Sequence, residues 1–463
     1  MTKTESYTLA ATMAVAGAAI GFFVSQKCAE HRSRASLQLT AIDDNALHLH
    51  DEESANDTSR CIYLDYNGTT PVYPQILQAM LPYLTTQFGN PSSGHLFHRQ
   101  PRQAVDRARK QLLTLLGQPE ADLSSIWFTS CGTESDNLAI QLALQSSSKL
   151  ISTRFGAHTL PHIVSCNVEH PAISGYLDAL VEEKVCEVTY VPVQSDGMVS
   201  ADAMIAAIQP QTILMTLMLA NNESGALQPV QKVAQHCSKA NILFHTDAAQ
   251  AVGKVSVDLD DLGHPDMISI VGHKMGAPKG IACLYVRPGC CEQHGRALHN
   301  RGILLIGGGQ EHGRRGGTEN VPYIVGFGEA ASLATKDWKS NSIKMEGLRT
   351  RLLFNLENWL GKDMVRTNGP SNPAHRLPNT LSVGLKGIHS GALLAAIGDQ
   401  VAASAGATCH SASGVSSVLK AMGVPETFAR GTLRLSLGTH TTEQEVDKAS
   451  AIIVAQARKM TTP

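Results

Sequence analysis

The chain has 463 residues, of which 43% are apolar and 17% are charged, and its formal net charge is −2. This near-neutral balance gives no electrostatic basis for a nucleic-acid partner. The ten cysteines are scattered through the chain, and no two of them have CxxC spacing. That pattern argues against a disulfide scaffold and a structural zinc site, so we predict no metal site. The length suits one large two-lobed domain or two domains.

The N-terminal segment is predicted to lie outside the globular fold. Residues 7–24 contain no charged residue and are just long enough to cross a bilayer. We interpret residues 1–24 as a membrane anchor; Lys27, Arg32 and Arg34 then place the catalytic part in the cytosol by the positive-inside rule. A cleaved signal peptide is an alternative, whereas an organelle presequence would be rich in arginine. Residues 25–60 are polar and mixed in charge, which is typical of a linker.

The globular part is predicted to begin at Cys61 with a large domain over residues 61–335. Apolar residues recur at helical spacing between residues 103 and 117, and Gly117 stands where such a helix would end. From there to about Val286, short apolar runs alternate with helical patterns. This alternation predicts the α/β class, with a mostly parallel sheet covered by helices.

The pattern changes after about Lys336, and we predict a smaller C-terminal α/β domain over residues 336–463. An apolar stripe from Met345 to Trp359 predicts a helix, while NTLSVGL and TLRLSLG are typical of strands. Thr442 and Glu445 have the spacing of a capping box that opens a last helix. We expect the first residues of the globular part to pack with this smaller domain.

Three segments of the large domain carry candidate chemistry. ISIVGHKMGAPKG, at residues 268–280, predicts a buried strand that leaves Lys274 at its carboxyl end. ILFHTDAAQ places Asp247 at the end of another strand, and Gly132 and Thr133 stand between a strand and a helix. If the sheet is parallel, Asp247 and Lys274 open into one crevice.

Together these segments predict a binding site for pyridoxal 5′-phosphate (PLP). Amides at a helix start, with the Thr133 hydroxyl, suit a phosphate. A carboxylate such as Asp247 keeps a pyridine nitrogen protonated, and a desolvated Lys274 can form a Schiff base. Taken singly, a lysine is more often a solvated surface residue and a strand-end aspartate is often a helix cap. The prediction therefore depends on the combination.

Ten segments between about Tyr63 and Gly438 resemble, in the same order, those of the NifS-like PLP enzymes, which comprise cysteine desulfurases and selenocysteine lyases. They are YLDYNGTTP, FGNPSSGH, GTESDN, VEHPAI, NNESG, HTDAAQ, VGHK, GGGQEHGRRGGTEN, ATCHSASG and LRLSLG. The resemblance implies a fold-type I PLP-dependent transferase. It also implies that Lys274 carries the cofactor and then moves the Cα proton of the substrate.

The resemblance further implies roles for residues around the cofactor ring and the substrate. His170 would stack on the ring and act in acid–base catalysis, although by itself it would be interpreted as a buried, hydrogen-bonded histidine. Asn222 and Gln250 would bind the phenolic oxygen of the cofactor. Arg434 would hold the substrate carboxylate in a bidentate contact. Cys409 lies between small residues and would attack the sulfur or selenium of the substrate as a thiolate.

The cofactor phosphate has its own set of implied ligands. These are Gly132, Thr133, His273 and Thr318, of which Thr318 would come from a second subunit. The last assignment requires a homodimer. The family usually has serine or threonine two residues before the histidine, where this chain has Val271. One phosphate hydrogen bond is therefore expected to be missing or to be made elsewhere.

These roles predict a PLP-dependent lyase that resembles selenocysteine lyase and releases L-alanine. The VGHK form favours this function, whereas Pro171 replaces the acidic residue that vertebrate selenocysteine lyases carry after the stacking histidine. The alternative is a cysteine desulfurase that supplies sulfur for iron–sulfur clusters or tRNA. An acceptor protein for selenium or sulfur is a candidate partner in both cases. The set of Lys274, Asp247, His170 and Cys409 argues against a silent scaffold, and a transaminase would have no use for Cys409.

Overall fold

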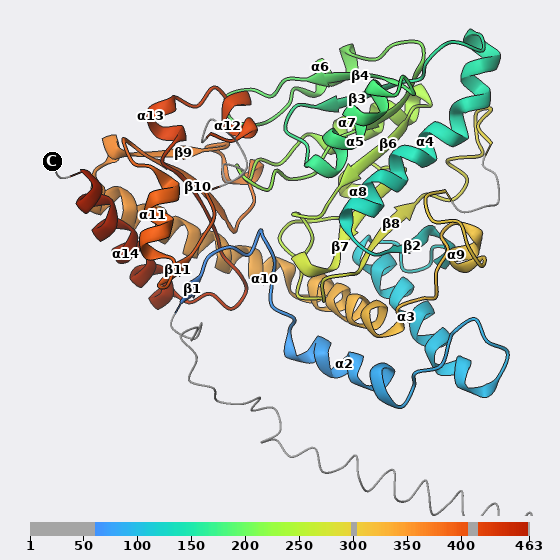
Figure 1. Cartoon of the computed structure of the whole chain (residues 1–463), viewed down its shortest axis with the longest axis horizontal. Helices are drawn as coiled ribbons and strands as arrows, with labels where there is room; N and C mark the ends of the chain where they lie inside the picture. Colours follow the sequence, from blue (N-terminus) through green and yellow to red (C-terminus); the bar gives the residue numbers. More distant parts are fainter. Residues whose placement is uncertain (1–60, 298–302, 406–414, 462–463) are drawn as a thin grey trace, which may run out of the picture. The chain divides into compact units, whose positions relative to one another are not determined.

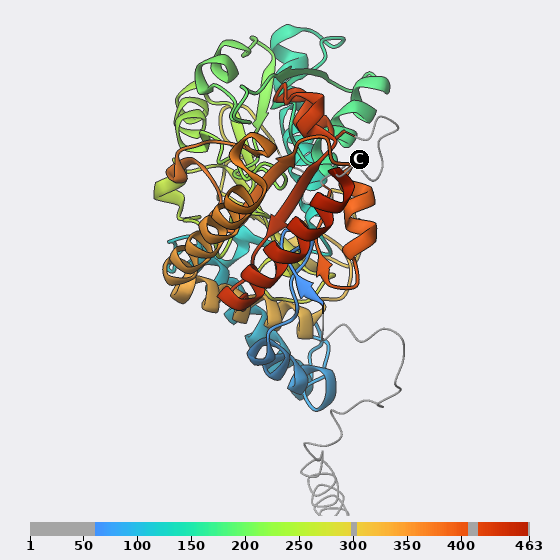
Figure 2. The same cartoon turned by 90° about the vertical axis from the view of Figure 1, so that its left-hand side faces the viewer.

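The computed structural model describes residues 61–297, 303–405 and 415–461. Figures 1 and 2 show two groups of strands, each covered by helices, with the long helix α10 passing from one group to the other. Residues 1–60, with the predicted anchor and linker, lie outside the described residues. In the part of the chain that is described, none of the helices has the length and apolar character needed to span a bilayer.

Seven of the described strands form the main sheet, which is mostly parallel. In spatial order they are β2 (Ile126–Thr129), β8 (Ala282–Val286), β7 (Met267–Val271), β6 (Leu243–Asp247), β5 (Thr212–Thr216), β3 (His162–Cys166) and β4 (Glu187–Val191). Only β8 among these strands runs antiparallel to its neighbours, β7 and β2. The predicted α/β class with a mostly parallel sheet is confirmed.

The central strands are apolar throughout because helices cover both faces of the sheet. Every residue of β5, β6 and β7 is buried. On one face, Ile268 and Ile270 pack into a core shared with α2 (Pro74–Thr85), α3 (Arg99–Leu115), α7 (Val230–Ala240) and the first half of α10 (Val321–Leu360). On the other face, Met267 packs into a core with α4 (Gly132–Phe155) and α5 (Pro171–Glu182). A strand that is buried on both faces is expected to have a mostly apolar sequence, and these strands do.

A third core forms around a smaller antiparallel sheet. Its strands are β12 (Thr432–Ser436), β10 (Thr380–Leu385) and β9 (Val365–Asn368), and β1 (Ile62–Tyr63) pairs with β11 (Val401–Ala402) beside them. Leu348, Leu352 and Leu356 of α10 pack into this core with α11 (Ser390–Ile397), α14 (Glu443–Thr461) and Leu64. The domain boundary at 335/336 stays a prediction, and α10 runs through that position without a break.

Local signals in the sequence account for several helix ends. The Glu445 amide donates to Thr442 Oγ1 over 3.2 Å, and the Thr442 amide donates to Glu445 Oε2 over 2.7 Å, so the expected capping box at the start of α14 is present. Helix α3 ends at Leu115, and Gly117 just beyond it has a φ of +74°. The shorter helices are α6 (Ala201–Ala206), α8 (Leu259–Leu262), α9 (Gln310–Gly313), α12 (Ser417–Ala421), α13 (Glu426–Ala429), η3 (Leu96–His98), η4 (Leu123–Ser125), η5 (Gly272–Lys274), η6 (Lys362–Met364) and η7 (Pro373–His375).

The parallel arrangement brings distant segments to one edge of the main sheet. Strands β3, β5, β6 and β7 are neighbours and point the same way, so their carboxyl ends lie together. The loop after β3 leads to His170, β6 ends at Asp247, and η5 directly follows β7 and ends at Lys274. This edge therefore collects the candidate chemistry of the chain.

Candidate active site

A cavity of about 350 Å³ lies at the carboxyl edge of the main sheet. Its walls come from the loops after four parallel strands, the start of α4, the segment after β1, and β12. The predicted site residues that line it are Gly132, Thr133, His170, Asn222, Asp247, Gln250, His273, Lys274 and Arg434. The structure thus brings these side chains together, while the role of each one stays a prediction.

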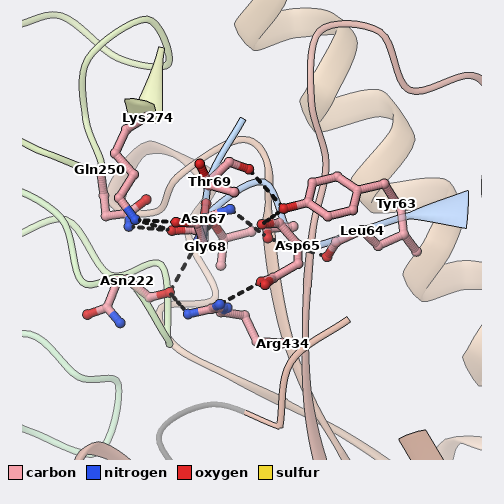
Figure 3. Close-up of polar contacts among 12 residues, drawn as sticks. Tyr63, Leu64, Asp65, Asn67, Gly68, Thr69, Asn222, Gln250, Lys274 and Arg434 are labelled. Carbon is pink, nitrogen blue, oxygen red and sulfur yellow. Dashed lines mark hydrogen bonds and ion pairs between the residues drawn. The ribbon is translucent and has the colours of Figure 1, made fainter. Parts of the chain in front are cut away.

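Lys274 reaches into this cavity from the end of η5. Its Nζ donates to the backbone carbonyls of Asn67 over 2.6 Å and of Gly68 over 2.8 Å (Figure 3). Burial lowers the pKa of Lys274 to about 8; the charge of Arg434 adds to this effect and that of Asp247 opposes it. Such a lysine has an appreciable neutral fraction near neutral pH, so its amine can act as a nucleophile or a base.

Asp247 provides a buried carboxyl group on the floor of the cavity. The residue is only 8% exposed, and its Oδ1 accepts a hydrogen bond from the Ala249 amide over 2.8 Å. Burial raises the pKa of Asp247, while that amide and the charges of His170 and Lys274 oppose the shift. A cationic group bound beside Asp247 would favour its ionised form. A protonated pyridine nitrogen meets this requirement.

His170 is held in one orientation at the start of α5. Its Nδ1 accepts a hydrogen bond from the Ala172 amide over 3.1 Å, which assigns the proton of the neutral ring to Nε2. Burial lowers the pKa of His170, and Lys274 adds to the shift against the opposing charge of Asp247. The neutral imidazole therefore lines the cavity as a flat, partly apolar group that suits stacking on an aromatic ring.

The start of α4 forms an anion-binding end of the cavity. The helix begins at Gly132, and the side chain of Cys131 before it makes no capping hydrogen bond. First-turn amides have no partner within a helix, so they can bind a phosphate. A Cβ at Gly132 would come within 2.7 Å of Val271 Cγ2, so a larger residue there would displace Val271. His273 also lines this part of the cavity, and its Nδ1 lies 3.1 Å from Thr69 Oγ1. Burial, together with the charge of Lys274, lowers the pKa of His273 to about 4, so its ring is neutral near pH 7.

Arg434 enters the cavity from β12. Its Nη2 donates to Asp65 Oδ1 over 2.6 Å, and its Nη1 donates to the Asn222 carbonyl over 3.3 Å (Figure 3). The Nε of Arg434 is buried and has no hydrogen-bond partner within the described residues. The guanidinium group thus lies at the wall of the cavity, and a group of this shape can bind a carboxylate.

Asn67 and Gly68 contribute to the site but received no role from the sequence. The Asn67 side chain donates to Thr380 Oγ1 over 2.8 Å and to the Asn222 carbonyl over 3.2 Å, and its Oδ1 accepts from Asn379 over 3.0 Å. Asn67 therefore connects two parts of the structure. Its loop holds the Lys274 amine, and its side chain binds the smaller sheet. The Asn-Gly pair is a turn signal that could have marked this segment.

Two predicted site residues lie elsewhere. Thr318 does not line the main cavity but borders a separate one of about 130 Å³, together with Ser130 and Gly280. Its loop is tied to α4 by Arg315, whose Nε lies 2.8 Å from Glu134 Oε1. Cys409 lies within residues 406–414, outside the described residues. Their predicted roles, at a partner's phosphate and in attack on the substrate, therefore stay predictions.

The residues of the cavity fit PLP. The free helix start suits the phosphate, the buried Asp247 suits the ring nitrogen, and the partly neutral Lys274 suits the aldehyde carbon.

Comparison with known proteins gives the same assignment. The family model described as aminotransferase class-V matches residues 62–449. The chain is 42% identical over 394 residues to a cysteine desulfurase of Nostoc sp., which covers 85% of this chain and 92% of that protein. It is 40% identical over 402 residues to the cysteine desulfurase IscS of an Anaeromyxobacter species, which covers 86% of this chain and 93% of that protein.

Solved structures agree with these relatives. A structure described as a NifS-like protein matches with a TM-score of 0.74 and 32% identity, and covers 85% of this chain and 98% of that one. DndA of Streptomyces lividans matches with a TM-score of 0.65 and 32% identity, and covers 80% of this chain and 98% of that one. The NifS-like resemblance, the fold-type I architecture and the cofactor inferred from the sequence are confirmed. The chain belongs to the class-V aminotransferase family and is a PLP-dependent enzyme of the NifS-like kind.

Proposed function

We propose that the protein is a cysteine desulfurase, which removes sulfur from L-cysteine and releases L-alanine. The observation that carries the proposal is the placement of Lys274, Asp247 and Arg434 around one cavity. Relatives named cysteine desulfurase, at 42% and 40% identity, support this function better than the selenocysteine lyase favoured by the sequence analysis. Cleavage of selenocysteine is kept as a second activity, which the Cys409 experiment below tests.

In this proposal each lining residue would bind a different part of the cofactor. Lys274 would hold PLP covalently, Asp247 would pair with its ring nitrogen, and His170 would stack on its ring. The phosphate would bind Gly132, Thr133, His273 and the partner's Thr318, and the phenolic oxygen would bind Asn222 and Gln250. Bound in this way, PLP withdraws electrons from the substrate Cα and makes its proton acidic.

The chain's own groups then orient the substrate and move protons. Arg434 would bind the substrate carboxylate, while Asp65 and the Asn222 carbonyl keep its guanidinium in place. Lys274 takes the Cα proton in its neutral form. The two carbonyl acceptors, on Asn67 and Gly68, direct its amine without adding a negative charge that would raise its pKa.

Cys409 would be the sulfur acceptor. Its thiolate attacks the substrate sulfur, so an S–S bond forms and the substrate C–S bond breaks. The electron pair of the broken bond stays with Cβ, which takes up one proton and leaves as the methyl group of alanine. The resulting persulfide on Cys409 can pass its outer sulfur to the thiol of an acceptor protein, which is the partner that this chemistry requires.

We propose that the enzyme works as a homodimer. The loop between α2 and α3 exposes Phe88 (68%), Leu96 (70%) and Phe97 (60%), which supports burial against a second copy. Thr318 would then reach the partner's phosphate site.

The dimer is tested by placing a charge in this exposed apolar surface. Phe97→Asp should shift the protein from dimer toward monomer in sedimentation experiments and lower its retention of PLP, because the partner's Thr318 is lost. Phe354→Asp, at a site on α10 that is 63% exposed, is the matched control and should stay dimeric. A wild-type protein that is monomeric at micromolar concentration would contradict the proposal.

We further propose that residues 7–24 anchor the enzyme in a membrane, with the catalytic part in the cytosol. The absence of charge in this segment and the basic residues Lys27, Arg32 and Arg34 after it support the proposal. The full-length protein should stay with membranes during alkaline carbonate extraction, and a chain that begins at Ser54 should be active without them. Recovery of the intact full-length chain in the supernatant alone would exclude an anchor.

The identity of the cofactor lysine can be tested directly. The purified protein should be yellow, and borohydride should fix the cofactor on the peptide that contains Lys274. Lys274→Ala should abolish both the fixed adduct and the release of alanine. The exposed Lys279 lies in the same loop, so Lys279→Ala is the matched control and should keep the adduct. An adduct on Lys254 or Lys279 in the wild-type protein would show that Lys274 has been wrongly assigned.

Substrate choice is tested by Cys409→Ser, which removes the thiolate but keeps the size of the side chain. We expect alanine release from cysteine to fall at least about a hundredfold, on the scale of losing a catalytic nucleophile. Release from selenocysteine should remain measurable, because selenium is a better leaving group and depends less on a positioned thiolate. Equal loss with both substrates would mean that Cys409 is the nucleophile for either element, and would leave no separate route for selenocysteine.

A further inference from the structure

A buried lysine, Lys254, lies next to Gln250 of the cofactor cavity. Lys254 follows β6 in the same turn as Gln250, and it is only 5% exposed. Within the described residues, no carboxylate oxygen lies within 4 Å of its Nζ, which instead donates to the Gln250 carbonyl over 2.9 Å and to Gln250 Oε1 over 3.3 Å. Buried lysines are rare unless they are paired, so this one calls for a specific cause.

The contacts of Lys254 continue to the catalytic amine through one side chain. Because Oε1 of Gln250 accepts from Lys254, the NH₂ group of this amide points the other way and donates to the Asn67 carbonyl over 3.0 Å. The same carbonyl accepts from Lys274 over 2.6 Å. The side-chain amide of Gln250 could rotate by half a turn, which would exchange the positions of its oxygen and its NH₂ group. A charged lysine beside it can only donate, so it keeps the amide oxygen on its own side.

Lys254 does not border the cofactor cavity, whereas Gln250 does. It borders a second cavity of about 240 Å³, which Lys274 also borders. Any effect of Lys254 on a bound cofactor must therefore pass through Gln250 or through its charge.

We propose that Lys254 is a positioning residue, which fixes the Gln250 amide with its NH₂ group toward the cofactor cavity and the Asn67 carbonyl. The inference rests on the proposed function, in which Gln250 binds the phenolic oxygen of PLP. A fixed donor suits that oxygen, which carries negative charge when the ring is bound. In the absence of Lys254, the amide would present its own oxygen to the cofactor in part of the molecules.

The charge of Lys254 changes near neutral pH. The cations that face it are Lys274 and Arg434, and the carboxylates nearest these two cations are Asp247 and Asp65. Burial lowers the pKa of Lys254 to about 7, and the two cations add to the shift. The amine is therefore charged, and can only donate, below about pH 7, so its effect on the Gln250 amide should be strongest there.

The test uses Lys254→Met in the holoenzyme, with cofactor release followed by visible absorbance at about pH 6, where Lys254 is charged. Cofactor release should become about fivefold more favourable, the scale of one hydrogen bond. Lys254→Arg keeps the charge and the N–H donors and should stay closer to the wild type. Lys239→Met, which removes an exposed lysine of α7, is the control for surface charge.

A double-mutant cycle tests whether Lys254 acts through Gln250. In a Gln250→Leu background, Lys254→Met should no longer change cofactor release, because the amide that Lys254 orients is gone. Full additivity in cofactor release would overturn the positioning role, as would unchanged release in folded Lys254→Met protein. A wild-type protein without cofactor on Lys274 would instead contradict the proposed function, so the two failures are distinguishable.

Discussion

The site depends on one contact, in which the Lys274 amine is held by the backbone carbonyls of Asn67 and Gly68. Two neutral acceptors orient the amine without the pKa increase that a carboxylate partner would cause. The Asn67 amide and side chain are in turn bonded to Ser436 of β12 and Thr380 of β10. Because those strands belong to the smaller sheet, Lys274 is in place only when the main and smaller sheets are both assembled. The packing of the two sheets therefore determines where the Lys274 amine lies.

The second constraint is the balance of buried charge. Lys254, Lys274 and Arg434 lie near one another, with Asp65 and Asp247 as the acidic groups that act on Lys274. Burial lowers the pKa of both lysines and raises that of Asp247, so each group is moved toward its neutral form. A phosphate at the start of α4 and a protonated ring nitrogen beside Asp247 would supply the missing partners. The protein without PLP thus has the charge pattern of a site shaped for a zwitterionic ligand.

Val271 is the residue on which the choice between a selenium and a sulfur substrate depended. Val271, in place of a serine or threonine, favoured a selenocysteine lyase in the sequence analysis. In the structure this side chain packs against Gly132 at the start of α4, where we propose that the cofactor phosphate binds. Val271 therefore bears on the proposed anchoring of the cofactor and says little about the leaving atom. The similarity over 85% of the chain to proteins named cysteine desulfurase has the greater weight.

The sequence by itself determined the features that depend on neighbours along the chain. Apolar runs identified the buried strands, the Thr442 and Glu445 spacing identified a helix start, and strand ends located Asp247 and Lys274. Only the tertiary structure decided which residues hold these groups. Asn67 and Lys274 are 207 residues apart, and Asp65 and Arg434 are 369 apart. Such contacts arise from the packing of one sheet beside another, and no local periodicity encodes them. Lys254 is the clearest case, because only the fold buries this lysine and places its amine against Gln250.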